Sequence, residues 1–245
     1  NGVPAEWIWA PESEDSRVIL YLHGGGYLFG SARTHRVMLA HMARAAKARV
    51  LALDYRLAPE IPFPAPVEDS VSAYRWLLAE GISAKKMVIG GDSAGGGLAV
   101  AALVALRAVG EPMPAAGVCI SAWTDMESTG QSHTTNAESD PSVSKERLLK
   151  IAKVYLDGKE PTAPLASPIH ADLTGLPPLL LQVGSIEVLL DDSTLLKSRA
   201  KAAGVSVEME VWDDMPHVWH HYAPILPEAR KAIGRIGEFV LEHTP

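Results

Sequence analysis

Short apolar segments rich in valine, isoleucine and leucine alternate along the chain with longer segments whose apolar positions recur at helical spacing. The short segments predict buried β-strands, and the longer ones predict helices that cover them. This alternation is typical of an α/β fold in which a mostly parallel sheet carries helices on both faces. The predicted strands occupy residues 5–10, 17–22, 50–54, 87–90, 116–120, 179–183 and 205–212. The predicted helices occupy residues 34–47, 67–79, 94–109, 191–203 and 228–243.

Two segments interrupt the alternation. Residues 57–66 contain four prolines and predict a loop, since proline removes backbone donors and disrupts a helix interior. Residues 121–178 are long for a connection, contain a helical piece at 144–156, and are a candidate cap or lid over a substrate pocket. Because no linker-like stretch divides the chain, we expect residues 1–245 to form one domain. The helix at 94–109 is apolar almost all round, as a buried central helix would be.

Composition narrows the classes of partner. The chain has 245 residues, of which 47% are hydrophobic, and its formal net charge is −7, which argues against nucleic acid or an anionic membrane surface as a partner. Cys119 is the single cysteine, lies in an apolar segment, and is expected to pack in the core. No apolar stretch is long enough for stable membrane insertion, so we expect a cytoplasmic protein. Asn1 as first residue suggests that the sequence is not a complete translation product.

The strongest chemical signal is the pentapeptide Gly91-Asp92-Ser93-Ala94-Gly95, a G-x-S-x-G pattern between a predicted strand and a small-residue helix. In this context the serine sits on a sharp, strained turn, and the flanking glycines remove Cβ atoms that would collide there. The following helix directs backbone amides at the reaction centre. Ser93 is therefore the predicted nucleophile. Nucleotide binding is disfavoured, because no Gly-Lys-Ser/Thr and no G-x-G-x-x-G register is present.

A second glycine cluster, His23-Gly24-Gly25-Gly26, ends an earlier strand and matches the H-G-G-G element that supplies an oxyanion hole. Bare glycine amides can approach a substrate oxygen closely. The expected donors are the amides of Gly25 and Gly26, together with the amide of Ala94. We interpret His23 as a structural residue that orders this loop.

A serine hydroxyl needs a base, and in this type of fold the base is a histidine that comes late in the chain. His217, His220, His221 and His243 are the candidates. His217 is preferred because it lies in the loop directly after the last predicted strand. His220 and His221 are interpreted as supporting or surface residues, and the three neighbouring histidines lack the glutamate of an H-E-x-x-H metal site.

A nucleophilic serine and its histidine base need a third catalytic residue, a carboxylate that orients the imidazole. This carboxylate should follow the strand at 179–183. Glu187, Asp191 and Asp192 compete for this role. Glu187 is favoured, because the two aspartates are already explained as the capping start of the next helix.

Six segments of the chain match motifs of one known family: residues 23–26, 54–60, 62–65, 91–96, 184–192 and 215–217. Through these segments the sequence resembles the microbial esterases of the hormone-sensitive lipase family, which have the α/β-hydrolase fold. The resemblance implies a catalytic triad of Ser93, Glu187 and His217.

The same resemblance implies an oxyanion hole at Gly25, Gly26 and Ala94, no cofactor, and a small-molecule ester substrate with a short or medium acyl chain. The resemblance also suggests that the protein forms a homodimer. Most members have aspartate where Glu187 stands, and members carry N-terminal cap helices ahead of the first strands, which this chain starts too late to contain.

Several residues near these motifs have two interpretations. Tyr27, Leu28, Trp123 and Trp219 flank motif loops and either line the acyl pocket or pack in the core. The segment at 54–60 is interpreted as structural, with Arg56 paired to a nearby carboxylate.

The predicted reaction is ester hydrolysis through an acyl-enzyme, with activity falling as pH drops through the pKa of His217, near 6.5 if unperturbed. One alternative is another serine hydrolase on the same fold, such as a peptidase or a deacetylase. A second is a non-catalytic, hormone-type binding protein similar to the plant gibberellin receptors, which resemble this family but have lost the triad histidine. His217 is present here and favours catalysis.

Overall fold

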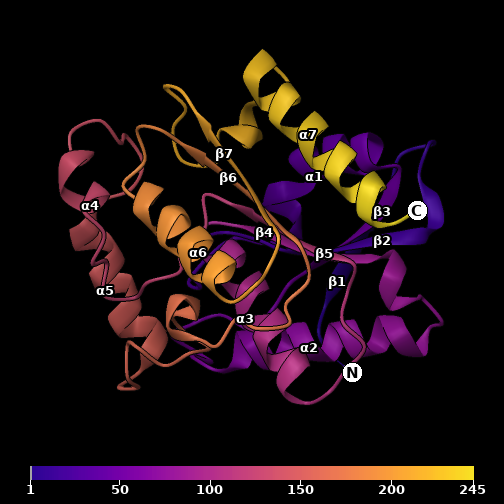
Figure 1. The fold of residues 1–245 in the computed structure, drawn as a ribbon, viewed down its shortest axis with the longest axis horizontal. Coiled ribbons are helices and arrows are strands. Elements are labelled where there is room, and N and C mark those ends of the chain that lie inside the picture. Colours follow the sequence, from indigo (N-terminus) through magenta and orange to yellow (C-terminus); the bar gives the residue numbers. More distant parts are fainter. Residues whose placement is uncertain (1) are drawn as a thin grey trace.

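The central element of the fold is a seven-stranded sheet with the order β1-β3-β2-β4-β5-β6-β7, seen in a computed structural model that describes residues 2–245 (Figure 1). The edge strand β1 runs antiparallel to β3, and every other neighbouring pair is parallel. The strands are β1 (Ala5–Ile8), β2 (Glu14–Leu22), β3 (Ala48–Leu53), β4 (Met87–Asp92), β5 (Ala116–Ile120), β6 (Leu179–Gly184) and β7 (Val207–Trp212).

Helices connect the strands in the order that the sequence predicts. The long helices are α1 (Ala32–Ala46), α2 (Ala65–Ala79), α3 (Ala94–Ala108), α5 (Lys145–Leu156), α6 (Leu190–Ala202) and α7 (Pro227–His243). The short ones are η1 (Ala84–Lys86), α4 (Ser132–Thr135), η2 (Pro168–His170) and η3 (Trp219–Tyr222). Across residues 2–245, none of these helices has both the length and the apolarity that crossing a bilayer requires.

The helices form a layer on each face of the sheet. Apolar residues of α1 and α7 share one buried cluster with η3 and one sheet face, and Figure 1 shows α1 and α7 side by side. Residues of α2, α3 and α6 share a second cluster with the opposite face. The expected α/β fold with a mostly parallel, doubly covered sheet is therefore confirmed.

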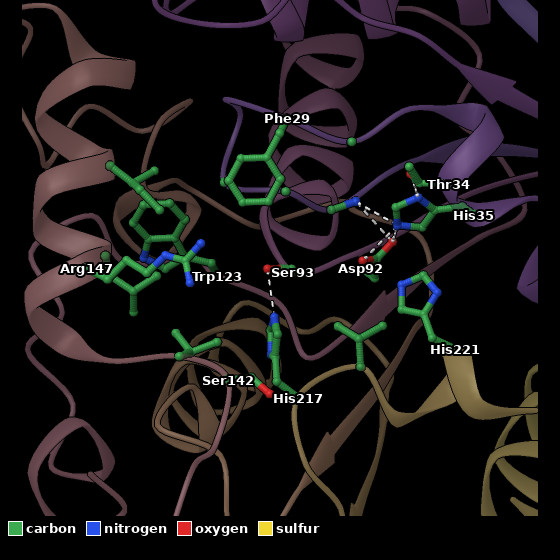
Figure 2. A pocket seen from close by; sticks show the side chains of 18 residues that line it. Phe29, Thr34, His35, Asp92, Ser93, Trp123, Ser142, Arg147, His217 and His221 are labelled. Carbon is green, nitrogen blue, oxygen red and sulfur yellow. Dashed lines mark hydrogen bonds and ion pairs between the residues drawn. The ribbon is translucent and has the colours of Figure 1, made fainter.

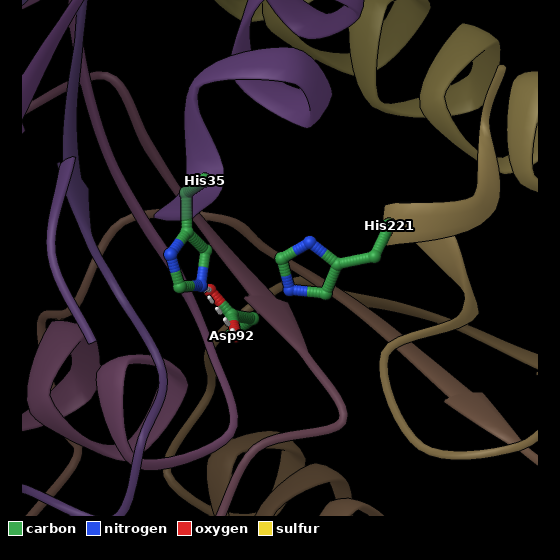
Figure 3. A group of neighbouring side chains, drawn as sticks. All are labelled: His35, Asp92 and His221. Atoms are coloured by element: carbon green, nitrogen blue, oxygen red, sulfur yellow. Dashed lines mark hydrogen bonds and ion pairs between the residues drawn. The ribbon is translucent and has the colours of Figure 1, made fainter. Parts of the chain in front are cut away.

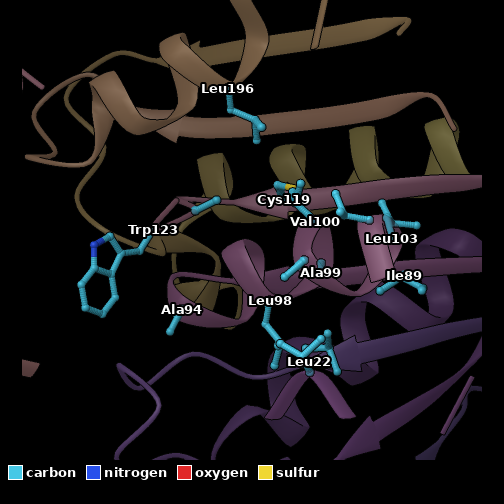
Figure 4. Packing of buried hydrophobic residues seen from close by; sticks show 14 of the residues in the cluster. Leu22, Ile89, Ala94, Leu98, Ala99, Val100, Leu103, Cys119, Trp123 and Leu196 are labelled. Atoms are coloured by element: carbon cyan, nitrogen blue, oxygen red, sulfur yellow. The ribbon is translucent and has the colours of Figure 1, made fainter. Parts of the chain in front are cut away.

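Helix α3 lies in the centre of the second cluster, as its all-round apolar sequence predicts (Figure 4). Leu98 and Leu103 are fully buried and lie among side chains of β2, β4 and β5. Cys119 on β5 is buried in the same cluster, and burial raises the pKa of its thiol to about 12. Its predicted place in the core is confirmed, and its thiol stays protonated and inert near neutral pH.

Several predicted boundaries were wrong: β1 ends at Ile8 and not at residue 10, β2 begins at Glu14 and not at residue 17, and β7 begins at Val207 and not at residue 205. The loop predicted at 57–66 ends earlier than expected, because α2 begins at Ala65 and includes Pro66 in its first turn. A proline is tolerated there, since the N–H groups of a first turn have no partner within the helix.

The long connection between β5 and β6 contains α4, α5 and η2. Figure 1 shows α4 and α5 together at one end of the molecule, away from α1, α2 and α7. Leu148 and Ile151 of α5 line the pocket described below. This position is consistent with the cap predicted for residues 121–178, and the capping role stays a prediction.

Candidate active site

Ser93 stands in the turn between β4 and α3, with φ 54° and ψ −123°. A non-glycine residue at such angles stores on the order of 1–3 kcal/mol of strain. The turn is held in place because the Ser93 N–H donates to the carbonyl of Ile120 at 2.8 Å. A Cβ atom on Gly91 or Gly95 would collide with backbone, in the second case with the carbonyl oxygen of Leu22. The two glycines of the pentapeptide are therefore required by close packing.

The three residues predicted as a triad form one continuous hydrogen-bonded chain. His217 Nε2 lies 2.9 Å from Ser93 Oγ, and His217 Nδ1 lies 2.8 Å from Glu187 Oε2. Because the carboxylate can only accept, Nδ1 carries the proton and Nε2 is free to accept from the serine hydroxyl. Figure 2 shows His217 with its ring tip directed at Ser93. The loops after β4, β6 and β7 bring these residues together at the carboxyl ends of the strands.

Glu187 is completely buried and holds its orientation through two further hydrogen bonds. Its Oε1 accepts from Ser121 Oγ at 2.7 Å and from the Gly184 N–H at 2.7 Å, which leaves Oε2 for His217. Ser121 Oγ in turn accepts the N–H of Val218 at 3.2 Å. Ser121, the first residue after β5, was missed in the sequence, because its role depends on two loops that are remote along the chain.

The competing aspartates lie away from the serine and bind the connection between β5 and β6. Asp192 accepts the N–H groups of Thr124 and Asp125 at 2.8 and 3.0 Å, and Asp191 accepts the N–H of Ser132 at 2.8 Å. Both aspartates lie in the first turn of α6, as predicted, but the prediction that they cap it was wrong. Helix α6 has Leu189 at its N-cap, with no side-chain cap.

The pKa of His217 reflects two opposing influences. Burial alone lowers the pKa of an imidazole, but the hydrogen bond and charge of Glu187, helped by Asp140 and Asp92, outweigh it and raise the pKa above its ordinary value. Asp140 also accepts the N–H of Val188 at 2.9 Å, so it stands close to the loop that carries Glu187. A histidine in this setting is a stronger base than a free one.

The glycine loop after β2 lies beside the serine. Gly25 and Gly26 have φ values of 120° and 62°, which glycine adopts without strain. Within residues 2–245, the amides of Gly25, Gly26 and Ala94 donate to no protein acceptor. His23 is buried, stacks on Tyr55 with ring centroids 4.3 Å apart, and has Nδ1 2.7 Å from the carbonyl of Gly24. These contacts match the loop-ordering role expected for His23.

Asp92, the residue before the serine, links this loop to the nucleophile turn. Its Oδ1 accepts from Tyr21 Oη at 2.8 Å and from the Gly24 N–H at 3.1 Å, and its carboxylate lies 3.2 Å from His35 Nε2. Burial raises the pKa of a carboxyl group, but the charge and hydrogen bond of His35 overcome this and hold the pKa of Asp92 far below its usual range. The sequence pattern contained Asp92 without revealing its partners.

A pocket of about 540 Å³ opens above Ser93 (Figure 2). Its apolar lining includes Phe29, Trp123, Val143, Leu148 and Ile151, and its polar lining includes Ser93, His217 and His35. Such a cavity, with a few convergent polar groups on an apolar wall, suits a small organic ligand.

The sequence left two interpretations for four residues near the motifs, lining of the acyl pocket or packing in the core, and the structure divides the four between them. Trp123 lines the pocket. Tyr27, Leu28 and Trp219 pack against the core clusters and are not among the residues that line this pocket in the described part of the chain.

Arg56 has the carboxylate partners that the sequence suggested. Its guanidinium lies 2.7 Å from Asp69 and 3.0 Å from Glu68. Asp69 also accepts the backbone N–H of Arg56 at 2.8 Å, so this ion pair anchors the segment at 54–60 against α2. The predicted pairing of Arg56 with a nearby carboxylate is confirmed.

The other late histidines are not in contact with Ser93. His220 is buried with Nε2 2.8 Å from Gln182 Oε1, and burial lowers its pKa to about 3. His243 Nδ1 lies 2.9 Å from the carbonyl of Phe239. His221 is exposed and lines the pocket on the side of His35.

Comparisons with known proteins agree with the fold. Residues 19–221 match the model of a protein family described as having the alpha/beta hydrolase fold. The chain is 53% identical over 236 residues to an acetyl-hydrolase of Streptomyces hygroscopicus, covering 96% of this chain and 79% of that protein. It is 37% identical over 239 residues to an esterase of Acinetobacter venetianus, covering 97% of this chain and 78% of that protein.

Solved structures are similar over the whole chain. A crystal structure of an esterase from the bacterial hormone-sensitive lipase family has a TM-score of 0.99 and 69% identity, and the match covers 100% of this chain and 82% of that one. The esterase EstE5, soaked with p-nitrophenyl butyrate, has a TM-score of 0.97 and 53% identity, over 99% of this chain and 82% of that one. The chain therefore belongs to the bacterial hormone-sensitive lipase family of α/β-hydrolase-fold enzymes.

Proposed function

We propose that this chain is a serine carboxylesterase that hydrolyses short- and medium-chain acyl esters through an acyl-enzyme on Ser93. The observation that carries the proposal is the continuous hydrogen-bonded chain from Ser93 through His217 to Glu187 at the wall of an apolar pocket. A nucleophile, a base and a group that orients the base are the minimum set for this chemistry.

In the first half-reaction, His217 Nε2 accepts the hydroxyl proton while Ser93 Oγ attacks the ester carbonyl. The imidazolium that forms is stabilised by Glu187, whose carboxylate is 2.8 Å from Nδ1. The amides of Gly25, Gly26 and Ala94 donate to the oxyanion. Collapse of the tetrahedral intermediate transfers the proton from His217 to the departing alcohol and leaves the acyl group on Ser93.

In the second half-reaction, His217 takes a proton from water, which attacks the acyl carbonyl. A second tetrahedral intermediate forms, supported by the same amides, and its collapse returns the proton to Ser93 Oγ and releases the acid. The chemistry requires neutral His217 at the start of both halves.

The size and lining of the pocket support esters with small apolar groups. A cavity of about 540 Å³ lies within the usual range of small-molecule sites, and α5 places Leu148 and Ile151 in its wall. The names of two relatives point the same way, since one is an acetyl-hydrolase and another was soaked with a butyrate ester.

The proposal is tested with p-nitrophenyl esters whose acyl chains run from two to about sixteen carbons. We expect kcat/KM to be highest for the short and medium chains and to be lost in Ser93→Ala at every length. A peptide anilide measured in parallel separates an esterase from a peptidase. Turnover of the anilide at the rate of the best ester, or a rate with Ser93→Ala equal to that of the unaltered chain, contradicts the proposal.

The non-catalytic alternative loses support from the position of His217, which lies within hydrogen-bond distance of Ser93. Two further expectations stay predictions. Light scattering tests the homodimer, and cell fractionation tests the cytoplasmic location.

A further inference from the structure

Three side chains that the proposed mechanism does not require as acid or base gather at one side of the pocket. His35 comes from α1, Asp92 from the end of β4, and His221 from η3 (Figure 3). One potential ligand atom from each lies within 4.8 Å of the others. All three line the pocket together with Ser93.

The hydrogen bonds of His35 fix which of its nitrogens faces this cluster. Nδ1 lies 2.8 Å from Thr34 Oγ1 and 3.2 Å from the carbonyl oxygen of Ser31. The Thr34 hydroxyl donates its proton to that same carbonyl at 2.8 Å, so both oxygens accept and Nδ1 carries a proton. In the neutral ring Nε2 then presents a lone pair, and the Gly24 N–H points at it from 3.3 Å. A backbone carbonyl behind the distal nitrogen is the usual support of a metal-binding histidine.

The carboxylate of Asp92 presents its second oxygen to the same place. Oδ1 accepts from Tyr21 and from Gly24 and lies 3.2 Å from His35 Nε2, and Oδ2, which has no other partner in the described part of the chain, lies 3.3 Å from the same nitrogen. A lone pair on Nε2 and a carboxylate oxygen therefore face each other at hydrogen-bond distance. The Gly24 N–H donates to both groups, and a positive charge between them, carried by a proton on Nε2 or by a metal ion, stabilises the arrangement further.

His221 supplies a third potential metal ligand, a ring nitrogen, from the opposite side of the cluster. Its ring stands edge-on to that of His35, with centroids 4.7 Å apart, and it is exposed on the pocket side (Figure 3). Zinc bonds of about 2.0–2.2 Å in a tetrahedral arrangement place ligand atoms about 3.4 Å apart. His35 and Asp92 already have this separation, and an exposed His221 side chain can rotate to complete it.

We propose that His35, Asp92 and His221 form an inhibitory site for a divalent transition metal ion of the zinc class. Two imidazoles and one carboxylate are ligands that this class of ion prefers, while magnesium prefers oxygen ligands alone. The ion sits beside Ser93, on the side of the pocket away from α5 (Figure 2). The three side chains leave one coordination position of the ion open to a small ligand such as water. The ion and this ligand occupy part of the pocket that the ester needs, so the rate of ester hydrolysis falls.

The test begins with protein freed of metal by a chelator, into which zinc sulfate is titrated in a calorimeter. We expect one ion per chain and a parallel loss of p-nitrophenyl acetate hydrolysis, with no effect of magnesium at the same concentration. Binding is measured again in Ser93→Ala, where it should be unchanged. Zinc binding to Ser93→Ala tests this proposal separately from the proposed esterase reaction, because the binding measurement requires no catalysis.

Three variants locate the ion. His221→Gln should weaken zinc binding at least tenfold and raise the inhibiting concentration by the same factor relative to its own basal rate. His243→Gln, remote from the pocket, is the matched control and should bind as the unaltered chain does. His217→Gln should still bind zinc. Absence of binding at millimolar zinc, unchanged binding by His221→Gln, or loss of binding in His217→Gln overturns the proposal.

Discussion

Ser121 Oγ donates to Glu187 Oε1 at 2.7 Å and accepts the N–H of Val218 at 3.2 Å. One hydroxyl at the end of β5 thereby joins the loop that carries the proposed acid to the loop that carries the proposed base. Since the Gly184 N–H occupies the same oxygen of Glu187, the other oxygen is directed at His217.

Ser121→Ala is expected to lower kcat by about tenfold, because it leaves Glu187 with one donor fewer and releases the Val218 amide. KM should change little, since Ser121 is not among the residues that line the pocket. Steady-state kinetics on p-nitrophenyl butyrate measure both constants. Ser128→Ala, at another buried serine in the described part of the chain whose hydroxyl has no partner, is the control, and an equal loss of kcat there contradicts a specific role.

Replacing members of the triad should give losses that do not add. Ser93→Ala and His217→Gln are each expected to reduce kcat by at least about a thousandfold, and the double variant should be no worse than the poorer single one. Circular dichroism verifies that each variant is folded. Multiplicative losses in the double variant indicate that the two residues act in separate steps.

The pH dependence follows from the raised pKa of His217. Because the reaction requires the neutral imidazole, kcat/KM should fall as pH decreases through that pKa, with a midpoint above 6.5. Burial works against this shift and Glu187 produces it, so Glu187→Gln should move the midpoint to lower pH as well as reduce the rate. Profiles from pH 5 to 9 for both proteins measure the two midpoints. A flat profile removes His217 as the base.

The ion pair between Arg56 and Asp69 should contribute to stability. The Asp69 side chain is 5% exposed and that of Arg56 is 39% exposed, so Arg56→Met leaves a buried carboxylate with less compensation. We expect the free energy of unfolding to fall by about 1–3 kcal/mol in urea denaturation. Arg75→Met, which breaks a more exposed pair with Glu111, should cost less than about 1 kcal/mol. Equal costs at both sites contradict the argument.

Much of the arrangement could be predicted from local sequence. Ser93, Glu187 and His217 each follow a recognisable strand, so parallel topology alone places their loops at one edge of the sheet. The two glycine clusters were equally visible, because close packing at those turns leaves no room for a Cβ atom.

What sequence could not supply were contacts between remote segments. Asp92 stood inside the pentapeptide, yet its partners Tyr21, Gly24 and His35 come from β2, the following loop and α1. Asp192 was interpreted as a helix cap, because acidic residues at a helix start usually interact locally, whereas it binds the N–H groups of Thr124 and Asp125. These pairings depend on tertiary packing, which residue type and spacing do not encode.

The central claim, that Ser93 is a nucleophile activated by His217, is tested most directly by intact-protein and peptide mass spectrometry after reaction with a fluorophosphonate. The account predicts one adduct per chain, located on Ser93, with no labelling of Ser93→Ala and greatly slowed labelling of His217→Gln. An adduct on a different residue, or labelling of Ser93→Ala at the rate of the unaltered chain, contradicts it.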